Sequence, residues 1–145
     1  MFEISDFYHY CKTHQVDVIP YDGCPKEGAT IRDEGYYGVF LDFTKIKSTR
    51  LLRGVCYHEL GHVATGALHK VDSPFELVER SEYRANRWAA EAYLTEHAFR
   101  EAFAAGFTEM WQLEEYFYLP GSEILAALHY WTDSRGIDFT IQEAE

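Results

Sequence analysis

The stretch LLRGVCYHELGHVATG, residues 51–66, contains the pattern on which both the fold and the expected chemistry depend. Its apolar residues recur at the spacing of one helix face. Ser48, just before it, is a favourable N-cap residue, and Gly66 is a favourable residue for ending a helix. We therefore predict one helix that begins after Ser48 and ends near Gly66.

The histidines of this helix form an H-E-x-x-H motif. His58 and His62 are four residues apart, so their side chains lie on one face of a helix and can converge on one ion. Zinc binds two imidazoles well, and a catalytic zinc site needs a third protein ligand and an open position. Glu59 is turned by about 100° from His58 around the helix axis. It therefore flanks the ion, which is the position of a general base in a hydrolytic reaction.

A second helix is predicted from its start signal. The segment SPFE, residues 73–76, matches a capping box with Pro74 at the first helical position. Val71 and Leu77 lie where a hydrophobic staple would lie. We expect this helix to extend to about Leu94.

Glu82 on this second helix is the third metal ligand that we expect. It shares a helix face with Ala85 and Ala89, whose small side chains allow another helix to approach closely. An inward-facing carboxylate needs a partner there, because a buried charge is costly unless it is paired or bound to a metal. Glu79, one turn earlier, and Glu91, further along the helix, remain the alternative ligands.

The rest of the chain alternates between strand and helix signals. Residues rich in β-branched and aromatic side chains predict strands over 16–21, 30–32 and 35–43, with residues 33–35 as a hairpin turn. Helices are predicted over 4–14 and from near residues 95, 108 and 122, and the tail 137–145 is expected to be irregular. We expect an α+β fold in one domain, residues 1–145, with a small antiparallel or mixed sheet of about three strands and about five or six helices. In it, the H-E-x-x-H helix packs against the helix that bears Glu82.

Composition excludes several classes of function. The 145 residues include 24 acidic and 13 basic side chains, a net charge of −11, which argues against binding to phosphate backbones or to anionic membranes. No stretch approaches the roughly 20 apolar residues of a membrane span, and the N-terminus lacks the basic residues of a signal peptide. The three cysteines are scattered along the sequence and none forms a C-x-x-C pair. We therefore expect free thiols in a reducing compartment. We expect a cytoplasmic protein that binds neither nucleic acid nor membrane.

The segments HELGH, residues 58–62, and E-x-x-A-N-x-W-A-A, residues 82–90, together resemble the ImmA/IrrE family of zinc metallopeptidases. The spacing from the second histidine to the glutamate also resembles that of thermolysin-like gluzincins. The resemblance extends over roughly residues 15–132. Trp88 replaces the usual Phe of the family, and residues 93–95 read Tyr-Leu-Thr where many relatives have Leu-Met-Pro.

This resemblance implies a zinc-dependent endopeptidase with His58, His62 and Glu82 as zinc ligands and Glu59 as the catalytic base. ImmA-like proteins are encoded on phages and mobile elements and act as antirepressors by cutting a helix-turn-helix repressor. IrrE-like relatives cleave a repressor of stress-response genes. The partner that the resemblance implies is therefore a protein substrate, a DNA-binding repressor.

Several alternatives stay open at this point. A third group usually stabilises the oxyanion of such a reaction, and the candidates are Tyr57, Tyr118, His129 and Tyr130, of which we favour His129. A His/His/Glu site also accommodates manganese or iron. The chain could instead be a non-catalytic, zinc-containing antirepressor or regulatory binding protein, or one component of a toxin–antitoxin pair.

Overall fold

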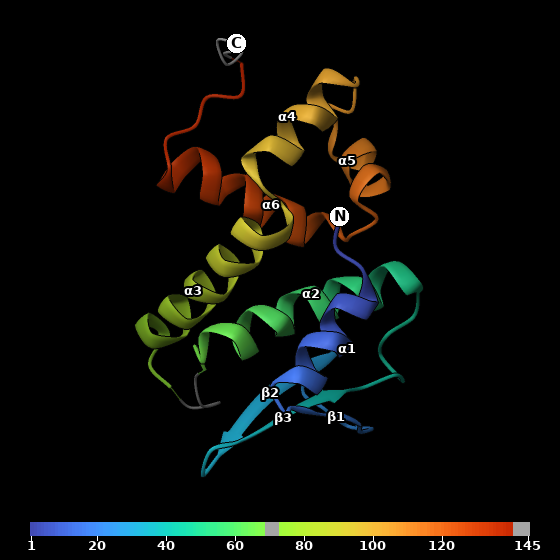
Figure 1. Ribbon diagram of the computed structural model, residues 1–145, viewed down its shortest axis with the longest axis vertical. Helices are drawn as coiled ribbons and strands as arrows, with labels where there is room; N and C mark the ends of the chain where they lie inside the picture. The colour runs from blue at the N-terminus through green and yellow to red at the C-terminus, as the bar shows by residue number, and fades with distance from the viewer. Residues whose placement is uncertain (69–72, 141–145) are drawn as a thin grey trace.

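The computed structural model describes residues 1–68 and 73–140 and contains a three-stranded sheet and six α-helices (Figure 1). The strands are β1 (Asp17–Pro20), β2 (Gly28–Asp33) and β3 (Tyr36–Leu41). The helices are α1 (Ile4–Thr13), α2 (Thr49–Thr65), α3 (Phe75–Tyr93), α4 (Glu96–Ala104), α5 (Met110–Phe117) and α6 (Gly121–His129), and a π-helical turn, η1 (Tyr130–Ser134), follows α6. The predicted α+β class is confirmed, whereas the π-helical turn was not predicted.

The sheet is mixed, with strand order β1-β3-β2. β1 runs parallel to β3, and β2 pairs with β3 in an antiparallel hairpin in which Asp33 lies opposite Tyr36. The two turn residues, Glu34 and Gly35, both have positive φ angles, 48° and 82°. Such a two-residue turn matches the right-handed twist of the strands it joins. The hairpin predicted at residues 33–35 is confirmed, and β2 is left as an edge strand.

Helix α2 begins and ends at the residues that its sequence indicates. The Ser48 hydroxyl accepts a hydrogen bond from the Leu51 amide at 3.1 Å, which satisfies one of the unpaired donors of the first turn. At the other end, Gly66 adopts the left-handed conformation, and its amide donates to the His62 carbonyl at 2.9 Å. Both predicted ends of α2 are thus confirmed.

Helix α3 begins one residue later than the capping-box pattern predicts. Pro74 is the N-cap residue, not the first helical residue, and the helix starts at Phe75. Pro74 has φ −54° and ψ 145°, so its backbone is still extended and the helical conformation begins only at Phe75. The predicted staple residue Val71 lies outside the described residues.

The sheet lies at one end of the molecule, and the other end is helical. Helix α2 runs along the sheet with α1 beside it, α3 packs against α2, and α4, α5 and α6 gather at the end away from the sheet (Figure 1). One hydrophobic core joins these parts, and its fully buried side chains include Phe7, Leu41, Leu60 and Phe99.

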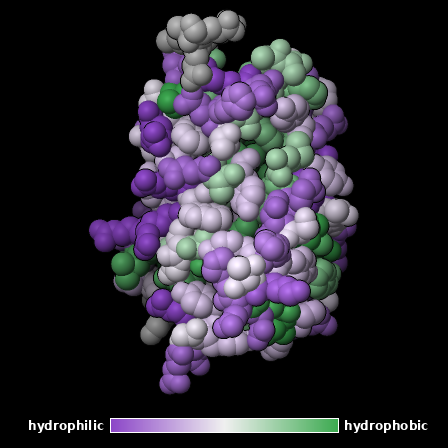
Figure 2. Space-filling view, in the orientation of Figure 1, coloured by the Kyte–Doolittle hydropathy of each residue, from purple (hydrophilic) through white to green (hydrophobic). Residues whose placement is uncertain are grey.

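The surface is largely polar. The face in Figure 2 is dominated by hydrophilic residues, with hydrophobic ones in small groups between them, as the charge of −11 leads one to expect. Cys11, Cys24 and Cys56 are buried free thiols. Among the helices of residues 1–68 and 73–140, none combines the length and apolarity that crossing a bilayer requires.

Candidate metal centre

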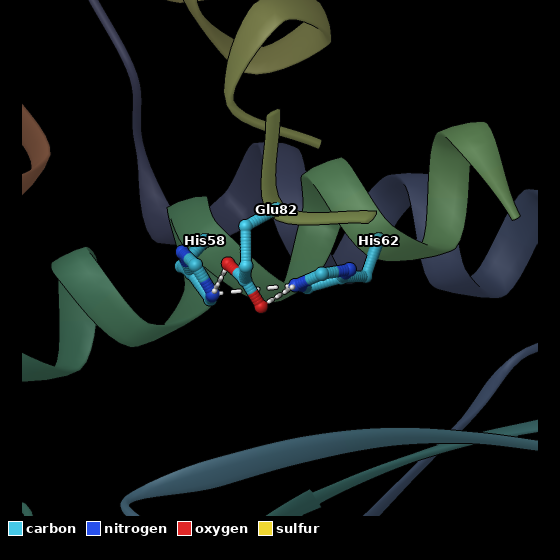
Figure 3. Close-up of side chains that lie close together, drawn as sticks. All are labelled: His58, His62 and Glu82. Carbon is cyan, nitrogen blue, oxygen red and sulfur yellow. Dashed lines mark hydrogen bonds and ion pairs between the residues drawn. The ribbon is translucent and has the colours of Figure 1, made fainter. Parts of the chain in front are cut away.

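His58, His62 and Glu82 converge where α3 crosses α2 (Figure 3). The two Nε2 atoms lie 3.3 Å apart. The Glu82 carboxylate lies between them, with Oε2 at 3.1 Å from Nε2 of His58 and Oε1 at 3.2 Å from Nε2 of His62. One ligand atom from each residue thus falls within 4.8 Å of the other two. Two imidazole nitrogens and one carboxylate oxygen are a donor set that suits a divalent transition metal.

The small residues of α3 allow this convergence. Ala85 and Ala89 are almost completely buried, as the sequence pattern predicted for the face that Glu82 shares. Their short side chains let the axes of α2 and α3 approach closely. Glu82 can therefore place its carboxylate directly over two histidines of the neighbouring helix.

The His62 ring is held by a backbone carbonyl. Its Nδ1 lies 2.6 Å from the carbonyl oxygen of Ala67, just beyond the end of α2. The hydroxyl of Ser81 donates to the same oxygen at 2.6 Å, which ties α3 to this bend. Because Nδ1 donates its proton to Ala67, the lone pair of a neutral His62 ring is on Nε2, the atom that faces Glu82.

The histidines and carboxylates of the cluster shift each other's pKa values. Burial alone would lower the pKa of His58, but the Glu123 and Glu82 carboxylates outweigh it and raise this pKa to about 11. Burial also opposes protonation of His62, yet Glu82 and the Ala67 carbonyl raise its pKa above the usual range. In the other direction, both histidines outweigh burial and hold the pKa of Glu82 well below its ordinary value. Without an ion, the two histidines and the carboxylate therefore favour each other's charged forms.

Glu59 lies beside the cluster and is held by the sheet. Its side chain is buried, and the hydroxyl of Thr30, on β2, donates to its Oε2 at 2.5 Å. β2 reaches this position because Gly28 has no side chain, since a β-carbon there would lie 2.7 Å from Cγ1 of Val55 on α2. The edge strand therefore contacts α2 next to the candidate metal site and fixes the orientation of Glu59.

His58 has a second carboxylate neighbour that the sequence did not predict. Its Nδ1 lies 3.6 Å from Oε2 of Glu123 in the first turn of α6. Thr30 was missed in the same way. Two glycines could have indicated these neighbours. Gly28 lets β2 approach α2, and Gly54 lets the segment before α6 approach α2, in both cases close to the motif.

The two alternative ligands lie elsewhere. Glu79 is exposed on α3, one turn before Glu82. The Glu91 carboxylate accepts hydrogen bonds from the Tyr130 hydroxyl and from Arg87. Of the three glutamates considered, Glu82 is the one that joins the two histidines.

Three of the four candidates for oxyanion stabilisation make other contacts. Tyr57 is buried with its ring edge-on to Phe2, and Tyr118 lies over the guanidinium group of Arg53. Tyr130 donates to Glu91, as described above. His129 is exposed at the last residue of α6. An oxyanion role for His129 stays a prediction.

The comparisons with known proteins gave one match. A family model, Peptidase_M78, described as the IrrE N-terminal-like domain, matches residues 45–129. The matched region is more than half of the chain and extends from just before α2 to the end of α6, so it includes His58, His62, Glu82 and Glu123. No curated protein and no solved structure matches the chain.

Proposed function

The chain belongs to the Peptidase_M78 family of IrrE N-terminal-like domains, and from this we propose that it is a zinc-dependent endopeptidase that cuts a partner protein. The observation that supports the proposal most is the convergence of His58, His62 and Glu82 on one point from two helices. Two imidazoles and one carboxylate are the protein ligands of many catalytic zinc sites, which keep a further position open.

The chemistry of these donors fits zinc. Each histidine directs Nε2 toward the cluster centre, and the carboxylate of Glu82 supplies the negative charge that a divalent ion needs. When bound, the ion supplies a Lewis acid that polarises a carbonyl group and lowers the pKa of water. His58, His62 and Glu82 would hold it.

Glu59 is the general base in this proposal. Its carboxylate is held next to the metal ligands, and Thr30 already donates to Oε2, so Oε1 is the atom that would accept a proton from the attacking water. Protonated Glu59 would then pass this proton to the amine that leaves when the peptide bond breaks. The burial of Glu59 limits competition from bulk water during this transfer.

The edge strand β2 offers a way to position a substrate. Its inner edge pairs with β3, while its outer edge has no strand beside it in the described sheet. An extended peptide could add to this edge through backbone hydrogen bonds, which bind a main chain largely irrespective of its side chains. Since Thr30 of β2 contacts Glu59, a peptide on this edge would lie beside the base.

As the partner, we propose a helix-turn-helix repressor of a phage or mobile element, cut in the cytoplasm. This part rests on the resemblance of the HELGH and E-x-x-A-N segments to ImmA/IrrE peptidases. The acidic surface supports a protein partner over a nucleic acid, because phosphate backbones would be repelled.

The first experiment is metal analysis of tag-free protein by plasma mass spectrometry. We expect about one zinc per chain in the wild type, a sharp loss in Glu82→Ala and retention in Glu79→Ala, the matched exposed glutamate on the same helix. A wild type that binds no metal, even on titration, would refute the proposal.

The second experiment incubates the zinc-loaded protein with the repressor encoded nearest to its gene and identifies products by mass spectrometry. Cleavage by the wild type, absent with Glu59→Gln, supports the peptidase. A stable complex with intact repressor that forms equally well with Glu59→Gln would favour the binding protein instead.

A further inference from the structure

Glu123 lies on the side of His58 that faces away from the metal-binding cluster. Nε2 of His58 faces Glu82, whereas Nδ1, the other ring nitrogen, faces Oε2 of Glu123 at 3.6 Å. The Glu123 side chain is 18% exposed, so water competes only partly for its carboxylate. A histidine placed in this way can bind a metal ion through one ring nitrogen and donate a hydrogen bond through the other.

The backbone around Glu123 is fixed by close packing against α2. Gly54, four residues before His58 and thus on the same face, lies so near Pro120 that a β-carbon would meet its Cγ at 2.5 Å. The buried guanidinium of Arg53 donates to the carbonyl oxygens of Phe117 and Tyr118, at 3.2 and 2.7 Å. Arg53 and Gly54, about one turn before His58, therefore anchor the start of α6 on α2.

We propose that Glu123 is a positioning residue that holds the His58 ring through Nδ1–H and so presents Nε2 to the metal ion. The inference rests on the proposed metal centre and deepens it. The present separation of 3.6 Å is that of an ion pair, and a shift of about half an ångström would give a normal N–H···O hydrogen bond. Ring orientation, tautomer and basicity of the ligand all follow from that bond.

The two histidines are thus held by different acceptors. His62 donates through Nδ1 to a neutral backbone carbonyl, that of Ala67, which no side-chain substitution removes. His58 depends on a charged side chain from a helix that is distant along the chain. A carboxylate acceptor makes the imidazole more basic than a carbonyl does, so His58 gains more as a ligand from its partner.

A purely structural role for Glu123 makes a different prediction. An acidic residue in the first turn of a helix is stabilised by the helix dipole, and Glu123 has that position in α6. Such a role would change the stability of the zinc-free protein and leave its metal affinity intact. Metal affinity is therefore the quantity to measure.

The test compares zinc dissociation constants, from competition with a chromophoric chelator, in the full chain. Glu123→Met keeps the bulk of the side chain but removes the acceptor, and Glu123→Gln keeps an acceptor oxygen without charge. Glu115→Met, at an exposed position of α5, is the matched control. We expect Glu123→Met to weaken zinc binding by about 10- to 100-fold, Glu123→Gln to fall between it and the wild type, and the control to be unchanged.

Two further readouts separate positioning from folding. Thermal melts in the presence of a chelator should show that the zinc-free variants remain folded. The visible absorption bands of the cobalt(II)-loaded protein should shift in Glu123→Met and less in Glu123→Gln, because these bands report ligand geometry.

The outcomes that overturn the inference are distinct from failure of the metal centre. A folded Glu123→Met with the wild-type dissociation constant would overturn it, and so would a Glu123→Gln protein that binds zinc as weakly as Glu123→Met. A wild type that binds no zinc would overturn the metal centre itself, and the role of Glu123 with it.

Discussion

The backbone carbonyl oxygen of Ala85 lies so close to Gly61 that a β-carbon on Gly61 would meet it at 2.5 Å. Gly61 stands between Glu59 and His62 in the motif, and Ala85 is three residues beyond Glu82. The absence of a side chain at Gly61 is therefore what allows α3 to lie against α2 at the level of the candidate metal ligands. The glycine is as much a part of the site as the residues that flank it.

A methyl group at this contact should loosen the helix pair. In an open helical position, replacing Gly with Ala stabilises a protein by up to about 1 kcal/mol. We expect the opposite sign for Gly61→Ala, a loss of about 1–3 kcal/mol of unfolding free energy, because the Ala85 carbonyl belongs to a rigid backbone. Urea denaturation measures it, and a variant more stable than the wild type would contradict this account of the helix contact.

Removal of the proposed base should stop the reaction without emptying the site. We expect Glu59→Gln to reduce cleavage at least about 100-fold while zinc content stays at the wild-type level, since Glu59 flanks the ligands. Glu79→Gln, on the exposed side of α3, should leave both quantities unchanged. Residual activity close to that of the wild type in Glu59→Gln would assign the base to another residue.

Zinc binding should release protons and strengthen as pH rises. Carboxylates raise the pKa of His58 to about 11, and the pKa of His62 is raised as well. At pH 7 His58 thus retains a proton that must leave before both of its ring nitrogens can serve the metal site, one as ligand and one as donor.

We expect about one proton, that of His58, to be released per zinc ion near pH 7, and the apparent affinity to increase by up to about tenfold per pH unit. Calorimetry in two buffers of different ionisation enthalpy measures the release directly. Binding that is independent of pH between 6 and 8 would show that the histidines are neutral before the metal arrives.

The buried guanidinium of Arg53 should dominate the stability of the region around α6. It donates to the Phe2 carbonyl and to Glu3 at 2.6 and 2.8 Å, besides its bonds to the segment before α6. We expect Arg53→Met to cost about 3–5 kcal/mol of unfolding free energy, because three backbone carbonyls, those of Phe2, Phe117 and Tyr118, lose their donor.

Arg50→Met is the matched control for this loss. Arg50 forms a partly exposed ion pair with Glu114 at 3.7 Å, which is expected to contribute at most about 1 kcal/mol. Chemical denaturation of both variants measures the difference. Equal losses would show that the Arg53 network contributes no more than a surface pair. Arg53→Lys should not restore stability, because an ammonium group cannot reproduce the planar fork of donors.

Features encoded by neighbouring residues could be predicted from the sequence. The Ser48 cap, the left-handed Gly66 and the Glu34–Gly35 hairpin turn each depend on a few adjacent positions, and all three are confirmed. The parallel pairing of β1 with β3 was left open, since it depends on a connection through β2 that no local pattern encodes. The start of α3 was placed one residue early because Pro74 fits both positions in the pattern.

The same distinction between neighbouring and distant residues applies to the candidate site. His58 and His62 share one helix, so their convergence follows from helical spacing alone. Glu82 followed from the small face of α3, and the structure brings all three together. Thr30 and Glu123 were missed because they reach α2 only through the packing of β2 and α6.

The order of these elements along the chain also has a consequence for how the protein folds. The three candidate metal ligands lie on α2 and α3, which are consecutive helices. By contrast, β2 and α6, which contact Glu59 and His58, are separated from α2 by other segments. Contacts between consecutive elements require less loop-closure entropy and form earlier than distant ones. If the proposed site binds zinc, a folding intermediate in which α2 is docked on α3 would already hold the ion. Zinc present from the start should then accelerate refolding, whereas zinc added to the folded chain would only slow unfolding.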